Sequence, residues 1–199
     1  MTAKTFHVHE HDWHSTDYVA EWIDRDVTRD DERRPVLKKM LALAPFARDA
    51  EIKVLDVGGG YGIVTDEVLR AFPRARVTLQ DYSQPMLDAA RKRLAAYEGR
   101  VRFALCDLTH AGWTKSVDGP FDLATSGIAI HNLRDKALIA GAYRGVAEAL
   151  KTGGMFLDYD YVEFSGGADW HLEALRAGGF KTAECAFTEG RAAILKAVK

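Results

Sequence analysis

The sequence has little of several features that would narrow its class at once. It has two cysteines among 199 residues, and its formal net charge is only -2 at pH 7. So small a charge provides no broad basic field for a nucleic acid backbone, which argues against nonspecific nucleic acid binding. No stretch approaches the roughly 20 apolar residues of a membrane span. With a polar, histidine-rich N-terminus, the sequence predicts a cytoplasmic protein without a membrane partner.

The two cysteines suggest no metal site. Cys106 and Cys185 lie far apart in apolar stretches, and their spacing matches no metal-binding motif. We expect both thiols to pack in the core of a protein from a reducing compartment. With 47% hydrophobic residues, the chain is long enough for one well-buried domain. We expect a helical extension or lid over residues 1–50 and that domain over residues 51–199.

The most informative segment is residues 52–62, an apolar run that ends in an aspartate and turns at once into glycines. The residues before Asp56 are typical of a buried parallel strand. The glycines of the pattern Asp-x-Gly-x-Gly-x-Gly allow a sharp turn where a β-carbon would block a ligand. The apolar spacing over residues 63–72 then predicts a helix whose N-terminal amides face that ligand. The segment therefore predicts a nucleotide site.

Strands and helices alternate after this segment, which predicts a sheet with helices on both faces. The predicted parallel strands cover residues 52–57, 75–80, 101–106, 121–126 and 155–159. Beyond residues 63–72, helices are predicted over residues 84–97, 134–150 and 170–177, and two more, 16–27 and 31–44, precede the first strand. Gly153-Gly154 is interpreted as the end of helix 134–150.

The last two predicted strands, 180–187 and 191–198, are joined only by Thr188-Glu189-Gly190. Three residues cannot carry a crossover helix, so these strands must pair antiparallel as a hairpin. The fold class is therefore α/β. We predict a Rossmann-like, doubly wound sheet of seven strands, with five parallel strands, a C-terminal antiparallel hairpin and an N-terminal helical cover.

The glycine pattern by itself leaves two cofactors open. The dinucleotide fingerprint requires its third glycine one place later, where this chain has Ile63. Asp81 ends the second strand 21 residues after Gly60 and can bind both hydroxyls of a ribose, which either cofactor carries. An NAD(P)-dependent Rossmann oxidoreductase therefore stays open as an alternative, although Ile63 and the terminal hairpin argue against it.

Five segments follow one another along the chain: Val54–Gly62 (VLDVGGGYG), Val77–Leu87 (VTLQDYSQPML), Val101–Leu108 (VRFALCDL), Phe121–Leu133 (FDLATSGIAIHNL) and Leu150–Leu157 (LKTGGMFL). In order and spacing they resemble the motifs of class I S-adenosylmethionine-dependent methyltransferases. The resemblance covers about residues 52–199 and includes the antiparallel last strand. The N-terminal part, with Trp13, Tyr18, Trp22 and Arg34, is similar to that of small bacterial methyltransferases of unassigned substrate.

The resemblance implies S-adenosylmethionine as the cofactor and assigns residues to its parts. These are Asp56, Gly58, Gly59, Gly60 and Gly62 for the amino acid part, Asp81 for the ribose, Asp107, Leu108, Tyr82 and Met86 for the adenine, and Ser126 and Gly127 for the methyl group and sulfonium. Three of the acids have plainer alternatives. Asp56 and Asp81 can cap the helices that follow them, and Asp107 can form an Asx turn.

His131 is the candidate catalytic residue. Methyl transfer is an in-line displacement that needs alignment and exclusion of water rather than a covalent intermediate. A hydroxyl or thiol acceptor has to lose a proton, and a nearby imidazole can take it. His131, five residues after Ser126, lies just beyond the fourth strand. The alternatives for His131 are packing, capping of the next helix, and substrate binding without proton transfer.

Residues outside the motifs are expected to contact the acceptor or to cover the cofactor. Tyr159 and Asp160, with their neighbours Asp158 and Tyr161, end the fifth strand, so we expect these side chains to face the crevice. The alternative for them is an exposed position at a strand end.

The N-terminal aromatics and histidines need a separate interpretation. We expect Trp13, Tyr18 and Trp22 to close over the cofactor, because aromatic faces suit a cationic sulfonium; ordinary core packing is the alternative. The four histidines of residues 7–14 match no closed metal motif, so no metal is predicted. The charged run 29–34 is interpreted as a solvated helix start.

The sequence thus predicts a methyltransferase that acts on a small molecule, with oxygen slightly favoured as the acceptor atom. Residues 126–129 are Ser-Gly-Ile-Ala, not the Asn/Asp-Pro-Pro-Tyr/Phe of enzymes that methylate amino groups of DNA bases or of glutamine. No acidic pair followed by asparagine matches metal-dependent catechol methyltransferases. A non-catalytic sensor or partner subunit that binds S-adenosylmethionine stays open, as does a homodimer.

Overall fold

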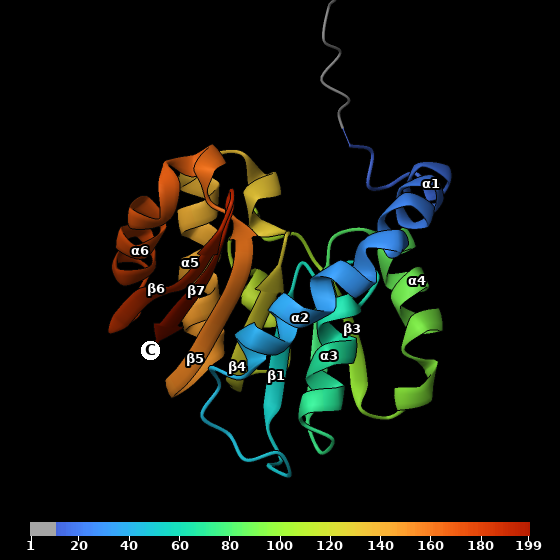
Figure 1. The fold of residues 1–199 in the computed structure, drawn as a ribbon, viewed down its shortest axis with the longest axis horizontal. Coiled ribbons are helices and arrows are strands. Elements are labelled where there is room, and N and C mark those ends of the chain that lie inside the picture. The colour runs from blue at the N-terminus through green and yellow to red at the C-terminus, as the bar shows by residue number, and fades with distance from the viewer. Residues whose placement is uncertain (1–10) are drawn as a thin grey trace, which may run out of the picture.

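A computed structural model describes residues 11–199 and contains one seven-stranded sheet in the order β3-β2-β1-β4-β5-β7-β6 (Figure 1). The strands are β1 (Lys53–Val57), β2 (Arg76–Asp81), β3 (Val101–Leu105), β4 (Phe121–Gly127), β5 (Leu150–Tyr161), β6 (Thr182–Glu189) and β7 (Ala192–Val198). Strands β1 to β5 pair in parallel, while β7 runs antiparallel to both β5 and β6. The predicted fold class and the terminal hairpin are confirmed.

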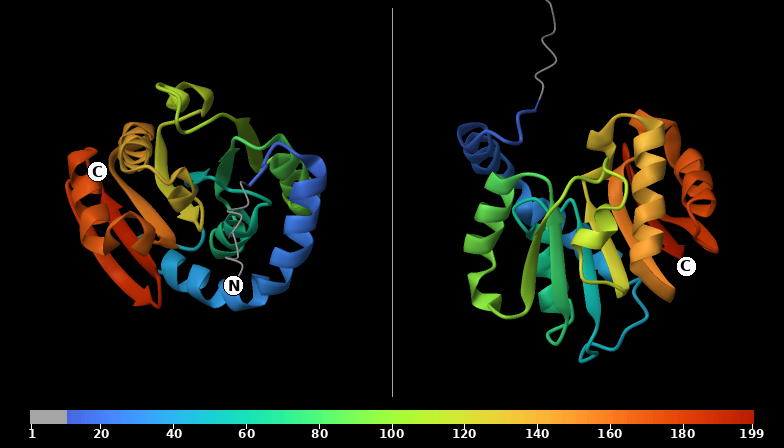
Figure 2. Two further views of the ribbon diagram at one scale, coloured as in Figure 1. Left: turned by 90° about the horizontal axis from the view of Figure 1, so that it is seen from above. Right: turned by 180° about the vertical axis from the view of Figure 1, so that it is seen from behind.

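Helices cover both faces of this sheet (Figure 2). They are α1 (Thr16–Asp26), α2 (Asp30–Leu41), α3 (Ile63–Ala71), α4 (Gln84–Arg93), α5 (Lys136–Ala149) and α6 (Gly167–Ala177), with short helical turns η1 (Val27–Arg29) and η4 (Ile130–Leu133). Helices α2, α3 and α4 lie on one face, and α5 and α6 on the other. No helix within residues 11–199 is long and apolar enough to cross a membrane.

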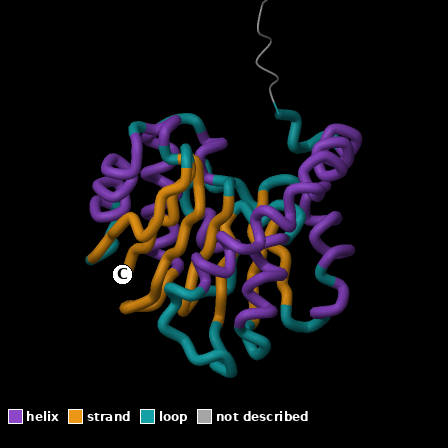
Figure 3. The backbone as a smooth tube through the Cα atoms, viewed as in Figure 1, coloured by secondary structure: helices purple, strands orange, loops and turns teal. Residues whose placement is uncertain are grey.

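The central strand β1 shows why its sequence is almost continuously apolar. Val54 packs with the helices of one face, and Leu55 and Val57 pack in the core beneath α5 and α6. All three side chains are fully buried, because helices cover both faces of a parallel sheet. Asp56, next to last in β1, is the exception to the pattern. Loops connect the strands at both ends of the sheet (Figure 3).

The border between α5 and β5 differs from the prediction. The helix ends at Ala149 and the strand begins at Leu150, so Gly153-Gly154 lies inside β5 rather than at a helix terminus. Gly153 has φ 79°, and the β4–β5 register shifts between Phe121 and Leu123. Glycines in a strand mark such irregularities, and the interpretation of this pair as a helix stop was wrong.

Candidate functional site

A cavity of about 500 Å³ lies at the carboxyl ends of the strands, beneath α1 and the start of α2. Parallel sheets of this kind bind ligands where the strand order reverses, here between β1 and β4. The predicted residues that line the cavity are Gly58, Gly59, Gly60, Asp81, Tyr82, Met86, Asp107, Leu108, Gly127, His131, Tyr159, Trp13 and Trp22. Those that the structure places elsewhere are Asp56, Gly62, Ser126, Tyr18 and Asp160.

The glycine turn after β1 forms the floor of the cavity. Gly58 and Gly60 have φ values of 61° and 53°, which side chains rarely tolerate. A β-carbon on Gly58 would lie 2.7 Å from the Ala129 side chain, whereas one on Gly60 would meet nothing within 4 Å. Gly60 therefore borders open space in the cavity wall, where a ligand can approach the backbone closely.

Asp81 holds the end of β2 against this turn. Its carboxylate accepts the Gly60 N–H at 2.9 Å and the Ser83 N–H at 2.8 Å. Burial raises the pKa of Asp81, and the backbone hydrogen bonds oppose that shift. Each carboxylate oxygen keeps a second lone pair, so the group can still accept hydrogen bonds from ligand hydroxyls.

Asp107 forms the Asx turn considered for it and also lies at the cavity wall. One of its oxygens accepts the Thr109 N–H at 2.8 Å, which is an Asx turn, while the residue also lines the cavity. Tyr82 lies on the same side of the cavity, 39% exposed, with the ring of His14 edge-on at 5.1 Å. This end of the cavity thus offers a carboxylate and an aromatic face.

Asp56 lies beneath the glycine turn, outside the cavity wall. It is fully buried and accepts the Thr65 hydroxyl at 2.6 Å and the Thr125 hydroxyl at 3.1 Å. Burial raises its pKa to about 7, against the opposing effect of these hydrogen bonds. Thr65 belongs to the first turn of α3, so the carboxyl group ties β1 to the helix that follows the turn.

Gly62 and Ser126 are also set back from the cavity. Gly62 precedes α3 with φ 90°, and a β-carbon there would lie 2.9 Å from the Leu94 side chain. Ser126 is fully buried, and its partner on β5 is Asp158. Side chains alternate along a strand, so Gly127 borders the cavity while Ser126 faces the other side of the sheet.

His131 and Asp160 form the most distinctive pair at the site. His131 lies on η4, just after β4, and lines the cavity. The Asp160 carboxylate is 2.5 Å from His131 Nδ1 and accepts the His131 backbone N–H at 2.8 Å. This contact assigns the ring proton to Nδ1, so the basic lone pair is on Nε2. The sequence predicted both residues but not their pairing.

The end of β5 divides its four polar side chains between two faces. Tyr159 and Tyr161 line the cavity, whereas Asp158 and Asp160 do not. Asp158 is fully buried, with one oxygen 3.3 Å from the Tyr143 hydroxyl, and burial and then the charge of Asp160 raise its pKa well above its usual range. The expectation that all four face the crevice was therefore wrong for the two aspartates, because strand residues alternate.

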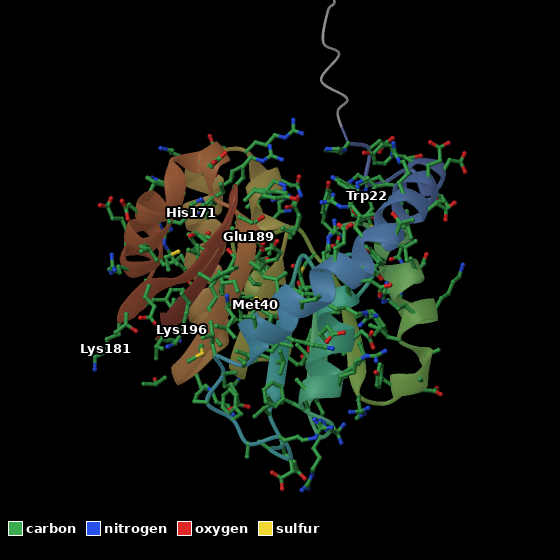
Figure 4. All side chains as sticks on the ribbon, in the orientation of Figure 1. Trp22, Met40, His171, Lys181, Glu189 and Lys196 are labelled. Carbon is green, nitrogen blue, oxygen red and sulfur yellow. The ribbon has the colours of Figure 1, made fainter. Side chains whose placement is uncertain are left out.

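The N-terminal aromatics meet over the cavity. Trp13 and Trp22 both line it, with ring centroids 5.2 Å apart, and Trp22 projects from α1 toward the middle of the molecule (Figure 4). The Ser83 hydroxyl donates to the Trp13 carbonyl, which ties this segment to the loop after β2. Tyr18 packs edge-on against Trp13 at 5.6 Å, outside the cavity wall.

The N-terminal histidines fall into two groups. His7 and His9 lie outside the described residues. His11 stacks on Trp13 at 5.1 Å and lines the cavity. His14 is the residue that packs against Tyr82.

Two arginines and a tyrosine belong to the site although sequence reasoning did not select them. Arg29, Arg33 and Tyr61 all line the cavity. Arg33 forms a two-point ion pair with buried Asp26, and the Tyr61 hydroxyl contacts Asp26 at 3.1 Å and Asp30 at 2.7 Å. The spacing of residues 29 and 33, one helical turn apart on the stripe that also carries Leu37, was the available signal.

The described residues fit S-adenosylmethionine. The open glycine turn can pass beneath its amino acid part, Asp81 can accept the ribose hydroxyls, and Asp107 is placed for the adenine amino group. The fit rests on the uncovered Gly60 and on the two carboxylates in the cavity wall. The side of the cavity formed by β4 and β5 carries His131, Tyr159 and Tyr161 instead, which suits a second ligand.

Comparison with known proteins finds methyltransferases, whose acceptors differ from one relative to another. The family described as methyltransferase domain matches residues 54–154. A malonyl-[acyl-carrier protein] O-methyltransferase from Magnetococcus marinus is 32% identical over 113 residues, which are 57% of this chain and 39% of that protein. The chain therefore spans about two fifths of that relative's length.

Solved structures resemble the fold over more of the chain. An O-methyltransferase family protein from Burkholderia thailandensis has a TM-score of 0.75 and 20% identity, and the match covers 94% of this chain and 60% of that one. PigF with SAH has a TM-score of 0.73 and 17% identity, with the same coverage of both chains. At these identities the likeness concerns the fold alone.

Proposed function

Because the chain belongs to the class I S-adenosylmethionine-dependent methyltransferases, we propose that it transfers the methyl group of S-adenosylmethionine to an oxygen atom of a small molecule. The cofactor supplies a methyl group bound to a cationic sulfur. A nucleophile attacks the methyl carbon and displaces the sulfur in line. The protein has to bind both molecules, align them and accept the proton that the acceptor loses. The residues of the cavity can be assigned to these tasks.

The observation that carries the proposal is the His131–Asp160 pair. Asp160 fixes the ring through Nδ1 at 2.5 Å and fixes the backbone of the same residue at 2.8 Å, so the imidazole is held at two points. A hydroxyl acceptor in the cavity can then give its proton to Nε2 as the methyl group is transferred. Asp160 stabilises the imidazolium that forms, as a carboxylate does beside a catalytic histidine in other enzymes.

The cofactor is proposed to lie along the glycine turn. Asp81 would hold the ribose and Asp107 the adenine, with Tyr82 and Met86 against the ring. Gly127, at the end of β4, would border the methyl group. Asp56 would act one step removed, by holding β1 and α3 in the geometry that the turn requires.

The cover supports a small acceptor. Trp13 and Trp22 both line the cavity, and Trp13 is tied to the loop after β2 through Ser83. A cavity of about 500 Å³ that also holds the cofactor leaves room for one small molecule. We propose that these aromatic side chains exclude water from the reaction and pack against the sulfonium.

A screen over acceptor classes tests the proposal. The purified chain is incubated with S-adenosylmethionine carrying a deuterated methyl group and with phenols, carboxylic acids, amines or thiols, and products are identified by mass spectrometry. We expect transfer to a hydroxyl oxygen. Transfer to nitrogen or sulfur alone would contradict the acceptor assignment. Binding of S-adenosylhomocysteine without any transfer would instead favour a sensor or partner subunit.

A further inference from the structure

The cavity wall contains two arginines with different surroundings. Arg33 is committed to Asp26 through two of its nitrogens, so its charge is neutralised within the protein. Arg29, one helical turn earlier, is exposed at the cavity wall and forms no hydrogen bond or ion pair with any residue from 11 to 199. The guanidinium of Arg29 is therefore available to a ligand.

Arg29 lies toward the acceptor end of the cavity, because it immediately precedes α2, which packs against β5 in the same apolar cluster as Tyr159. Arg33 and Arg29 are the cations whose charges lower the pKa of Tyr159, against the stronger effects of its burial, Tyr161 and Glu189. The charges that act on Tyr82, at the adenine end, are instead those of acids, chiefly Asp81 and Asp107. The cavity is thus acidic where the ribose and adenine are proposed to bind, and at the opposite end it carries Arg29, which has no ionic partner among residues 11–199.

The same end of the cavity offers aromatic faces. Tyr159 and Tyr161 line it side by side on β5, and the ring of His131 packs edge-on against Tyr161 at 5.2 Å. A planar acceptor can pack against these rings with its hydroxyl directed at His131. A guanidinium recognises a carboxylate with two parallel hydrogen bonds, which a lysine cannot reproduce.

We propose that the methyl acceptor is a hydroxyaryl carboxylate, and that Arg29 binds its carboxylate while His131 receives the proton of its hydroxyl. This inference rests on the proposed function and adds to it the substrate class. The carboxylate is held away from the transferred methyl group, so the product is an aryl methyl ether with the acid unchanged. Oxygen gains the methyl group, the acceptor proton passes to the imidazole, and sulfur leaves as a neutral thioether.

Matched pairs of acceptors test the proposal. Calorimetry in the presence of S-adenosylhomocysteine compares meta- and para-hydroxybenzoate and hydroxyphenylacetate with their neutral amides. We expect the wild-type chain to bind at least one acid about tenfold more tightly than its amide, as one charge-assisted pair provides. Arg29→Gln should abolish that preference, and Arg29→Lys should restore only part of it. Arg25→Gln removes the same charge from exposed α1, outside the cavity wall, and should retain the preference.

Each other result has a defined meaning. Absence of any preference for acids in the wild-type chain, or a preference that survives in Arg29→Gln, would overturn the proposal. Weaker binding of S-adenosylhomocysteine by Arg29→Gln, with unchanged binding of methylthioadenosine, would overturn it too, because Arg29 would then bind the cofactor's own carboxylate. Methyl transfer is assayed separately. Acid-selective binding without transfer contradicts the proposed function, whereas transfer without acid selectivity contradicts only the role of Arg29.

Discussion

Among single residues, Asp56 is a fully buried carboxyl group beneath the glycine turn, and its partners are hydroxyls rather than cations. Thr65 and Thr125 donate to it, but no positive charge among residues 11–199 compensates its burial. Burial is the main cause that raises its pKa to about 7. Asp56 therefore has a structural role, and the free energy of burying its carboxyl group depends on pH.

This cost predicts a pH dependence of stability. Asp56 in the unfolded chain releases its proton near its ordinary pKa of 3.8, whereas the folded chain retains it up to about pH 7. Between these values folding binds a proton, so stability falls as pH rises, by at most about 1.4 kcal/mol per pH unit. In Asp56→Asn this dependence disappears. Urea unfolding across the window should show the variant gaining stability relative to wild type as pH rises; parallel curves would contradict the assignment.

Ile128 is a residue in a strained conformation at the cavity. Its φ is 53°, which is unusual for a β-branched side chain, and its N–H donates to the Tyr159 carbonyl at 2.7 Å. The hydrogen bond holds the chain in this shape between β4 and η4, three residues before His131. Backbone strain of this kind persists where the surrounding structure fixes it.

Two substitutions separate strain from packing at this position. Ile128→Ala removes side-chain contacts and keeps the strain, whereas Ile128→Gly removes the contacts and relieves it. We expect the glycine variant to be more stable than the alanine variant by about 1 kcal/mol, the reverse of the usual order. Thermal or urea unfolding measures the difference. An alanine variant at least as stable as the glycine variant would show that the site is unstrained.

The strand ends could be predicted residue by residue, but the pairs across them could not. Asp81 and Asp107 follow their strands by simple position, and both line the cavity. Asp160 and His131 are 29 residues apart on different elements, and no local pattern links them. Strict alternation of side chains along β5 would have predicted that Asp160 faces away from the cavity. It would not have predicted the contact with His131, because that contact depends on the course of η4.

At the scale of elements, α1 and α2 are joined to the cofactor loop by a buried network of charges. Asp26 ends α1 and Asp30 begins α2, and both contact the Tyr61 hydroxyl in the glycine turn. Arg93 of α4 reaches Asp30 at 2.5 Å, and Arg33 pairs with Asp26. Residues 29–34 do contain a helix start, with Arg29, Asp31 and Glu32 exposed, but the interpretation of the run as solvated was wrong for Asp30 and Arg33.

The network predicts an effect of Tyr61→Phe on cofactor binding. Loss of the hydroxyl removes one donor from between two buried carboxylates, each of which keeps an arginine partner, and should destabilise the protein by about 1–3 kcal/mol and loosen the turn. Tyr97→Phe is the matched control, because Tyr97 donates to Asp66 at 2.9 Å and lies outside the cavity wall. Calorimetry should show weaker binding of S-adenosylhomocysteine by Tyr61→Phe alone. Equal affinities in the two variants would exclude coupling between the cover and the turn.

For the whole molecule, the alternation of elements and the short last connection predicted the seven-stranded topology correctly. Apolar periodicity and turn length are local properties, and they determine which strands are parallel. The irregular start of β5 was missed because two glycines end a helix and mark a strand irregularity equally well. The N-terminal aromatics predicted a cover over the cofactor. The ion pairs of Asp26 and Asp30 could not be predicted, because they depend on contacts that form only in the folded chain.

Removal of the cover tests its part in the whole. Deletion of residues 1–30 takes away both tryptophans and also Asp26 and Asp30, so we expect binding of S-adenosylhomocysteine to weaken at least about tenfold. The double variant Trp13→Ala, Trp22→Ala keeps the ionic network. It should also bind S-adenosylhomocysteine more weakly if the rings themselves cover the cofactor. Circular dichroism checks that both proteins are folded. Unchanged affinity and methyl transfer in the folded double variant would refute the cover.

The central claim, that His131 held by Asp160 takes the acceptor's proton, is tested most directly by the pH dependence of single-turnover methyl transfer in wild type and His131→Ala. The wild-type rate should depend on pH, because the proposed step transfers the acceptor's proton to His131. His131→Ala should be slower by about 100-fold or more and lose this dependence, with its affinity for S-adenosylhomocysteine unchanged. A variant that retains the wild-type rate and pH profile would contradict the account.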